Sequence, residues 1–333
     1  MITLGIETSC DETAIGIVNE KREVLANVLY SQFDEHAHYG GVVPEIAARA
    51  HLEKIKPIYL QAIKEAGITP QDIDLIAYTR GPGLMGPLLV GASFARGLAL
   101  DLDKPCVGIS HLEGHIAAAE MSFPELKPTY VALTVSGGHT EISIVHPGFK
   151  YEMLGRTRDD AAGEAFDKCG KLLGLGYPAG PVIGKTAAGG NRKFHRFPRS
   201  FKGEDHGEFS FSGLKSSVLR YVQEKGPEYL KENIRDICAS LEAAIVDILV
   251  DKSIWALKKT GLQNVIVCGG VSANRYLREQ LEKSCQKQGL KSYFPDFSLC
   301  TDNGAMIAGV AQARFNQGLL PEEHKVTPSL PLA

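Results

Sequence analysis

The segment 110–115 reads SHLEGH and places two histidines one helical turn apart, which is the clearest chemical signal in the sequence. Ser110 and, three residues later, Glu113 match a capping box, which predicts a helix beginning at His111. His111 and His115 then share one helix face, so both imidazoles can reach a single ion. Two ordinary histidines on a helix are the alternative. The peptidase motif H-E-x-x-H needs Glu directly after the first His, and Leu112 stands there, so a metallopeptidase is disfavoured.

A carboxylate near the end of the chain supplies a third candidate ligand. Asp302 lies in the segment TDNG at 301–304, which we expect to open the last helix at 303–316. Asp302 can cap that helix or interact with its dipole. Two histidines and one carboxylate also form a facial ligand set with open positions for substrate, suited to Fe(II) or Zn(II). We therefore expect one divalent ion, Fe(II) or Zn(II), at His111, His115 and Asp302.

Two glycine pairs follow apolar, strand-like runs. The segment SGGHT at 136–140 follows one run, and CGGVSAN at 268–274 precedes an expected helix. Adjacent glycines let a ligand approach the backbone and receive N–H groups, and a helix N-terminus adds to anion binding. Both turns are therefore candidate anion sites, with a simple hairpin turn as the alternative for the first.

The segment 179–186, AGPVIGKT, resembles a P-loop but lacks its chemistry. Ala179 replaces the first glycine, Pro181 removes an N–H, and no strand precedes the segment. We expect no phosphate-binding P-loop here.

Residues 191–202 combine positive charge with aromatic side chains and contain no acid. Cations can neutralise phosphates while the interleaved phenylalanines stack on bases or anchor the loop. A solvated loop pinned by its phenylalanines is the alternative. The candidate tRNA-contacting residues are Arg192, Lys193, Arg196, Arg199 and Lys202.

Composition excludes several classes of protein. The chain has 333 residues, 44% of them apolar and 23% charged, with a net charge of −3, so any nucleic-acid footprint must be local. Its seven cysteines are scattered and form no C-x-x-C motif, which indicates reduced thiols in a reducing compartment. The beginning of the chain has no signal-peptide pattern. The apolar stretch 84–102 contains Arg96 and Asp101 and predicts a buried helix, so we expect a cytoplasmic protein without membrane association.

The order of expected elements indicates an internal duplication. Strands are predicted at 3–8, 13–19 and 24–31, and the pattern restarts with strands at 130–135 and 140–145. A shift that aligns Ser9 with Ser136 also aligns Thr13 with Thr140. Strands at 75–79 and 265–268 each end in a glycine turn that leads to a helix.

The duplicated α/β architecture that fits is the two-lobed actin/hexokinase/chaperone ATPase-like fold, with a ligand cleft between lobes. We expect a first lobe at 1–127 and a second at 128–302, with an insertion around 159–211. A C-terminal helix and tail at 303–333 is expected to pack back on the first lobe.

Together the motifs resemble the tRNA N6-adenosine threonylcarbamoyltransferases, the TsaD family, formerly called O-sialoglycoprotein endopeptidase-like proteins. The matching stretches span nearly the whole chain: GIETSCDET at 5–13, GGVVPE at 40–45, GPGL at 81–84, SHLEGH at 110–115, VSGGHT at 135–140, FDK at 166–168, FSFSGLK at 209–215, GGVSAN at 269–274 and TDNGAMI at 301–307. The resemblance implies the actin-like fold and a metal at the two histidines and Asp302. It also implies adenylate contacts from Thr134, Val135, Ser136, Gly137, Gly138, Asp167, Gly180 and Asn274.

The resemblance implies a metal-dependent acyl transferase acting on tRNA. The family transfers the threonylcarbamoyl group of threonylcarbamoyl-AMP to N6 of the adenosine adjacent to the anticodon, in tRNAs that read codons starting with A. ATP is a second candidate nucleotide. Adenine N6 is a poor nucleophile, and Asp11 or Glu12 on the first turn can take its proton, with ordinary turn carboxylates as the alternative. The implied partners are tRNA, a paralogous actin-like subunit of the TsaB type and a small P-loop ATPase of the TsaE type.

Two positions depart from the family pattern, which usually has Gly at Ala179 and often a polar or acidic residue at Gly184. A ligand contact from position 184 is therefore not expected. The competing hypotheses are an ATP-dependent small-molecule kinase of the same fold, a metallopeptidase and a non-catalytic actin-like scaffold. The kinase and the scaffold leave the two histidines without a role.

Overall fold

The computed structural model describes residues 1–321 and 325–332. The chain divides into two compact units, and each is described by itself. Unit 1 comprises Met1–Leu126 and the chain from Pro295 onward, and unit 2 comprises Lys127–Phe294.

Unit 1 is built on a five-stranded mixed sheet of order β3-β2-β1-β4-β5. Its strands are β1 (Ile2–Glu7), β2 (Glu12–Asn19), β3 (Val24–Ser31), β4 (Leu75–Gly81) and β5 (Cys106–Ser110). Its helices are α1 (Phe33–Ala37), α2 (Pro44–Ala66), α3 (Met85–Leu102), α4 (His111–Ser122) and α10 (Gly304–Asn316). The first three strands run antiparallel, while β4 and β5 continue the sheet in parallel.

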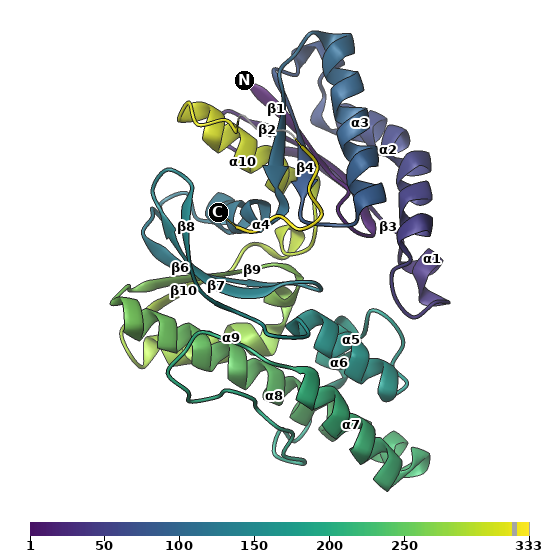
Figure 1. Ribbon diagram of the computed structural model, residues 1–333, viewed down its shortest axis with the longest axis vertical. Coiled ribbons are helices and arrows are strands. Elements are labelled where there is room, and N and C mark those ends of the chain that lie inside the picture. Colours follow the sequence, from purple (N-terminus) through teal and green to yellow (C-terminus); the bar gives the residue numbers. More distant parts are fainter. Residues whose placement is uncertain (322–324, 333) are drawn as a thin grey trace. The chain divides into compact units, whose positions relative to one another are not determined.

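The two faces of the unit 1 sheet are covered differently, as Figure 1 shows. Leu4, Ile6 and Ile15 pack with α2 and α3 in one apolar core. Gly5 and Gly16 pair across β1 and β2 and face α10 instead. A Cβ atom at Gly5 would lie 2.3 Å from the Ala308 nitrogen, and one at Gly16 would lie 2.0 Å from the Ala305 nitrogen. The two glycines therefore let α10 lie directly on the strands.

Unit 2 repeats the strand order of unit 1, as β8-β7-β6-β9-β10. Its strands are β6 (Tyr130–Val135), β7 (Thr140–His146), β8 (Lys150–Arg156), β9 (Asn264–Cys268) and β10 (Lys291–Tyr293). Its helices are α5 (Ala162–Leu172), α6 (Ala179–Thr186), α7 (Ser212–Lys225), α8 (Pro227–Thr260) and α9 (Arg275–Gln286). Again the first three strands are antiparallel and the last two are parallel additions, which confirms the duplicated α/β fold. The core of this unit lies between β6, β9 and helices α5, α7, α8 and α9.

The division of the chain differs from the expected lobes at two boundaries. Lys127, expected at the end of the first lobe, belongs to unit 2. Residues 295–302, which we assigned to the second lobe, belong to unit 1 together with α10. The reason is the close fit of α10 on β1 and β2, which draws the chain before it into unit 1.

Helix α3 is less buried than expected from its apolar sequence. By length and composition it is the one helix in the described parts of the chain that could cross a membrane, and 33% of its residues are buried. Ala92, Ala95 and Ala99 pack in the unit 1 core, whereas Leu100 is 84% exposed. The helix covers the sheet with one face, so the expected burial holds for that face and not for the rest of the helix.

Candidate functional site

Helix α4 begins where β5 ends, but not through the capping box that the sequence predicts. The Ser110 side chain makes no capping hydrogen bond. Glu113 instead accepts hydrogen bonds from Arg314 on α10, with 3.3 Å between Arg314 Nε and Glu113 Oε2. The prediction of a capping box is therefore wrong, because an ion pair from α10 takes the carboxylate. The helix start itself is as expected, so His111 and His115 lie one turn apart.

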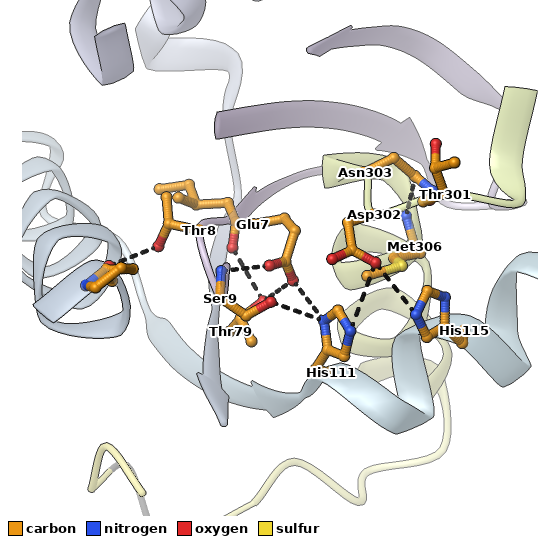
Figure 2. A network of polar contacts seen from close by, with 12 residues as sticks. Glu7, Thr8, Ser9, Thr79, His111, His115, Thr301, Asp302, Asn303 and Met306 are labelled. Atoms are coloured by element: carbon orange, nitrogen blue, oxygen red, sulfur yellow. Dashed lines mark hydrogen bonds and ion pairs between the residues drawn. The ribbon is translucent and has the colours of Figure 1, made fainter. Parts of the chain in front are cut away.

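The three predicted metal ligands come together in unit 1 (Figure 2). Asp302 Oδ1 lies 3.5 Å from His111 Nε2 and 3.2 Å from His115 Nε2. One ligand atom from each residue falls within 4.8 Å of the other two. Asp302 reaches this position because Asn303, not Asp302, caps α10 by accepting a hydrogen bond from the Met306 backbone N–H at 2.9 Å. The Asp302 carboxylate is thus left to face the histidines.

The chemistry of His115 fits a bound cation. Its side chain is fully buried, yet neither ring nitrogen has a hydrogen-bond partner within the described chain. Its Nε2 lies 3.2 Å from Asp302 Oδ1, and a metal ion is a partner that this nitrogen and this carboxylate oxygen can share. The donor set of two imidazoles and one carboxylate suits Fe(II) or Zn(II).

Glu7, at the end of β1, orients His111 from behind (Figure 2). Glu7 Oε2 lies 3.1 Å from His111 Nδ1. The same carboxylate accepts hydrogen bonds from the Ser9 backbone N–H and the Thr79 hydroxyl, both at 2.5 Å. When His111 Nδ1–H donates to Glu7, Nε2 keeps its lone pair. This lone pair can bind a candidate ion beside Asp302. Through this hydrogen bond Glu7 can hold the His111 ring in the orientation that a metal ligand needs.

Electrostatics around the triad favour a positive charge. Burial opposes the protonated imidazole, but Asp302 and Glu7 outweigh it and raise the pKa of His111 to about 9. Burial also raises the pKa of Glu7, but the charge of His111 and its hydrogen bond outweigh it, so the net shift is downward. Burial, Asp11 and Asp302 hold the pKa of Glu12 well above its usual range. A divalent ion supplies the positive charge that these carboxylates otherwise take from protons.

The turn that carries Asp11 and Glu12 is fixed by neighbouring elements. His51 Nε2 lies 3.0 Å from the Cys10 carbonyl oxygen, and His51 Nδ1 lies 2.8 Å from the Thr13 hydroxyl. Since a carbonyl only accepts, Nε2–H donates to Cys10 and Nδ1 accepts from Thr13. Burial lowers the pKa of His51, which keeps this neutral tautomer. The Gln32 backbone N–H also donates to the Asp11 carbonyl at 2.9 Å.

In unit 2 the turn after β6 leaves backbone groups accessible. Thr134 and Val135 are buried strand residues, and Ser136 closes the turn by accepting a hydrogen bond from the His139 N–H at 3.1 Å. Gly137 and Gly138 are exposed, and a Cβ atom on either would meet nothing within 4 Å. The two glycines thus offer an approach to the backbone, as the sequence predicts.

Asp167 and Asn274 cap two helices of unit 2. Asp167 Oδ1 accepts hydrogen bonds from the Ala179 and Gly180 backbone N–H groups at 2.7 and 3.4 Å, at the start of α6. Asn274 accepts from the Leu277 backbone N–H at 2.8 Å, at the start of α9. Both residues therefore have structural roles beside the ligand contacts that the family resemblance implies.

Residues 179–186 do not form a phosphate-binding loop, because they form helix α6. The departure at Ala179 is accommodated by Gly170: a Cβ atom on Gly170 would lie 2.1 Å from the Ala179 Cβ. At Gly184, a Cβ atom would lie 3.6 Å from both Asn274 Nδ2 and Glu242 Oε1.

The basic loop 191–202 meets acids that the local sequence does not contain. Arg192 pairs with Glu242 at 3.1 Å, Arg199 with Asp247 at 2.8 Å, and Lys202 with Asp247 at 3.3 Å. Both acids lie on α8. Lys193 and Arg196 remain exposed. Ion pairs therefore hold the loop along α8, and three of its five cations take part in them.

The fold and site define a class of protein: a duplicated α/β protein of the actin/hexokinase-like ATPase fold with a two-histidine, one-carboxylate candidate metal set. HypF of T. kodakarensis matches with a TM-score of 0.62 and 15% identity over 98% of this chain and 49% of that chain. Component A of the Acidaminococcus fermentans (R)-2-hydroxyglutaryl-CoA dehydratase matches with a TM-score of 0.57 and 16% identity over 95% of this chain and 98% of that chain. At these identities the likeness is one of fold.

Sequence comparison gives the family. Residues 23–309 match the family model described as TsaD, tRNA N6-adenosine threonylcarbamoyltransferase. The proteins of that name from Caldicellulosiruptor saccharolyticus and Syntrophus aciditrophicus are 48% and 49% identical, each over 96% of this chain and 94% of the relative. The chain belongs to the tRNA N6-adenosine threonylcarbamoyltransferase family.

Sequence reasoning missed the residues that support the site. The sequence places Glu7 in the stretch GIETSCDET but does not indicate that it contacts His111, and it does not indicate a role for Glu242. A carboxylate at the end of an otherwise apolar strand was the available signal for Glu7. No local signal pointed to Glu242, which lies 50 residues from Arg192 along the chain.

Proposed function

We propose that this protein transfers a threonylcarbamoyl group to N6 of an adenosine in tRNA. The observation that carries the proposal is a set of two buried histidines and one partly buried carboxylate, in which neither ring nitrogen of His115 makes a hydrogen bond within the described chain, in a member of this transferase family. A small-molecule kinase of the same fold would leave that set without a role.

The donor in this proposal is threonylcarbamoyl-AMP, a mixed carbamic–phosphoric anhydride. The acceptor is the adenosine adjacent to the anticodon in tRNAs that read codons starting with A. A bond forms between N6 and the carbamoyl carbon, the bond from that carbon to the phosphate oxygen breaks, AMP leaves, and N6 loses a proton. Because N6 is a weak nucleophile, positioning and stabilisation of the developing negative charge supply most of the rate.

Unit 2 is proposed to bind the adenylate. The exposed Gly137 and Gly138 backbone is suited to donate N–H groups to the phosphate, and the Asn274 amide and Asp167 carboxylate to hydrogen-bond the nucleoside. Thr134, Val135 and Gly180 are proposed to shape this site.

His111, His115 and Asp302 would hold one Fe(II) or Zn(II) ion. Such an ion supplies Lewis-acid polarisation of donor oxygens when bound. Glu7 fixes the His111 ring, and His51 fixes the turn that presents Asp11 and Glu12, the proposed proton acceptors.

The proposed partners are tRNA, a paralogous actin-like subunit and a small P-loop ATPase, in the cytoplasm. Support for a local tRNA contact comes from Lys193 and Arg196, the exposed cations of the 191–202 loop.

Incubation of the purified protein with tRNA and threonylcarbamoyl-AMP, with and without the two proposed partner proteins, tests the function. Nucleoside mass analysis is expected to show threonylcarbamoyladenosine in tRNAs with an A at the acceptor position. No modified nucleoside under any combination would overturn the proposal.

A further inference from the structure

We propose that Arg192 is a positioning residue for the adenylate site and not a tRNA contact: it fixes Glu242, and Glu242 fixes the Asn274 amide. The inference rests on the proposed function, which makes Asn274 an adenylate contact. It separates Arg192 from the other cations of the 191–202 loop.

The Arg192 guanidinium is held on two sides within unit 2. Its Nη2 lies 3.1 Å from Glu242 Oε2, and its Cζ lies 3.8 Å from the centre of the Tyr276 ring. Stacking on an aromatic face and pairing with a carboxylate along the edge use the planar geometry that distinguishes arginine from lysine. A guanidinium that is stacked on one face and paired at Nη2 is held in one orientation on unit 2.

Glu242, held by Arg192, in turn orients the Asn274 side chain. Its side chain is only 3% exposed, and its second oxygen, Oε1, accepts a hydrogen bond from Asn274 Nδ2 at 2.9 Å. Asn274 Oδ1 is already used by the Leu277 backbone N–H. With its oxygen and one amide hydrogen committed, the Asn274 side chain has one orientation, and the second Nδ2 hydrogen is the one it can offer to a ligand.

The Glu242–Asn274 pair lies at a place where the chain leaves room. A side chain at position 184 would begin 3.6 Å from both Glu242 Oε1 and Asn274 Nδ2, but this position is Gly184 on α6. Gly180, one turn earlier on the same helix, is among the proposed adenylate contacts. The pair therefore faces the helix that carries part of the proposed nucleotide site.

Removing Arg192 leaves a buried carboxylate without its cation. Such a group either takes up a proton or draws water and neighbouring donors toward itself, and both change the hydrogen bond to Asn274. Lys193 is the matched control, because it is the adjacent cation and exposed to solvent. Its removal changes the loop charge by the same amount without touching Glu242.

Calorimetric titration of the full-length protein with AMP tests the proposal. Arg192→Ala is expected to raise the Kd for AMP roughly tenfold, a typical coupling within one hydrogen-bonded network, whereas Lys193→Ala leaves it within about twofold. Arg192→Ala combined with Glu242→Gln is expected to recover most of the affinity, because a glutamine oxygen still accepts from Asn274 and no charge is left unpaired. Thermal unfolding of each variant shows whether it is folded.

Three outcomes with the variants contradict the inference: equal AMP affinity for the wild type and Arg192→Ala, equal weakening by Arg192→Ala and Lys193→Ala, or no recovery in the double variant. Undetectable AMP binding by the wild type would contradict it as well. If the wild type binds AMP and the variants behave as expected but no threonylcarbamoyladenosine forms, the proposed function fails while the network stands. Modified tRNA together with unaffected Arg192→Ala binding removes the inference alone.

Discussion

The two sheets share one strand order, but the turns of their first hairpins carry different residues. The turn between β1 and β2 leads into Asp11 and Glu12, and His51 and Gln32 hold it by hydrogen bonds. The turn between β6 and β7 has Gly137 and Gly138, where an added Cβ atom would meet nothing within 4 Å. The first turn carries carboxylates and is fixed in place, whereas the second leaves its backbone accessible, as an anion site requires. The two copies thus share one strand order, and their turn residues suit them to different ligands.

The largest expected effect is the loss of the cation from unit 1. His111→Ala combined with His115→Ala should reduce bound metal from about one equivalent to background, since a lone carboxylate does not retain a divalent ion. Metal analysis after purification measures it, with AMP titration as the control, because the ligand site of unit 2 is untouched. Full metal occupancy in the double variant would mean that the ion lies elsewhere.

The next effect tests the close fit of α10, which has no counterpart at the open turn of unit 2. Gly16→Ala places a Cβ atom 2.0 Å from the Ala305 nitrogen and should destabilise the protein by about 3 kcal/mol. Gly137→Ala is the matched control and should change the free energy of unfolding by less than about 0.5 kcal/mol. Denaturant unfolding of both variants decides, and equal stabilities would show that α10 can shift to accept the methyl group.

A smaller effect separates the two roles of Asp167 in unit 2. Asp167→Ala removes both the α6 cap and the proposed ligand contact, and should weaken AMP binding by about 1–3 kcal/mol. Asp167→Asn keeps an oxygen for the Ala179 N–H but loses the negative charge. Calorimetry on both variants distinguishes the roles: if the asparagine variant binds like the wild type, the carboxylate charge takes no part in binding. Unchanged affinity in Asp167→Ala removes the residue from the site.

The smallest effect concerns tRNA. Lys193→Ala with Arg196→Ala should weaken tRNA binding modestly and reduce the slope of log affinity against log salt, by up to about 0.7–0.9 for each lost phosphate contact. Arg199→Ala is the control, because Arg199 already pairs with Asp247 and should change the slope little. Affinities measured across a salt series, alone and with the proposed partners, test the difference. Equal slopes for all three proteins would assign the loop a structural role only.

The sequence predicted best where the signal was periodic or local. The prediction that His111 and His115 lie together is confirmed, because positions i and i+4 are neighbours on one helix face. The capping box was wrong because Arg314, 201 residues away, competes for Glu113. For the same reason the local sequence of the loop 191–202 does not show its ion pairs: the loop contains no acid, and the acids that pair with it are spaced along α8. Long-range ion pairs leave no trace in a local pattern.

The position of α10 also sets when this protein can finish folding. Gly5 and Gly16 are synthesised long before the helix that covers them, which begins at Gly304. At roughly 5–20 residues per second, about 15–60 s pass between the synthesis of these two strands and the synthesis of helix α10. Asp302 is synthesised just before this helix, so the three candidate metal ligands can come together only after residue 302 has been made. An ion bound by them would therefore report that synthesis has passed Asp302.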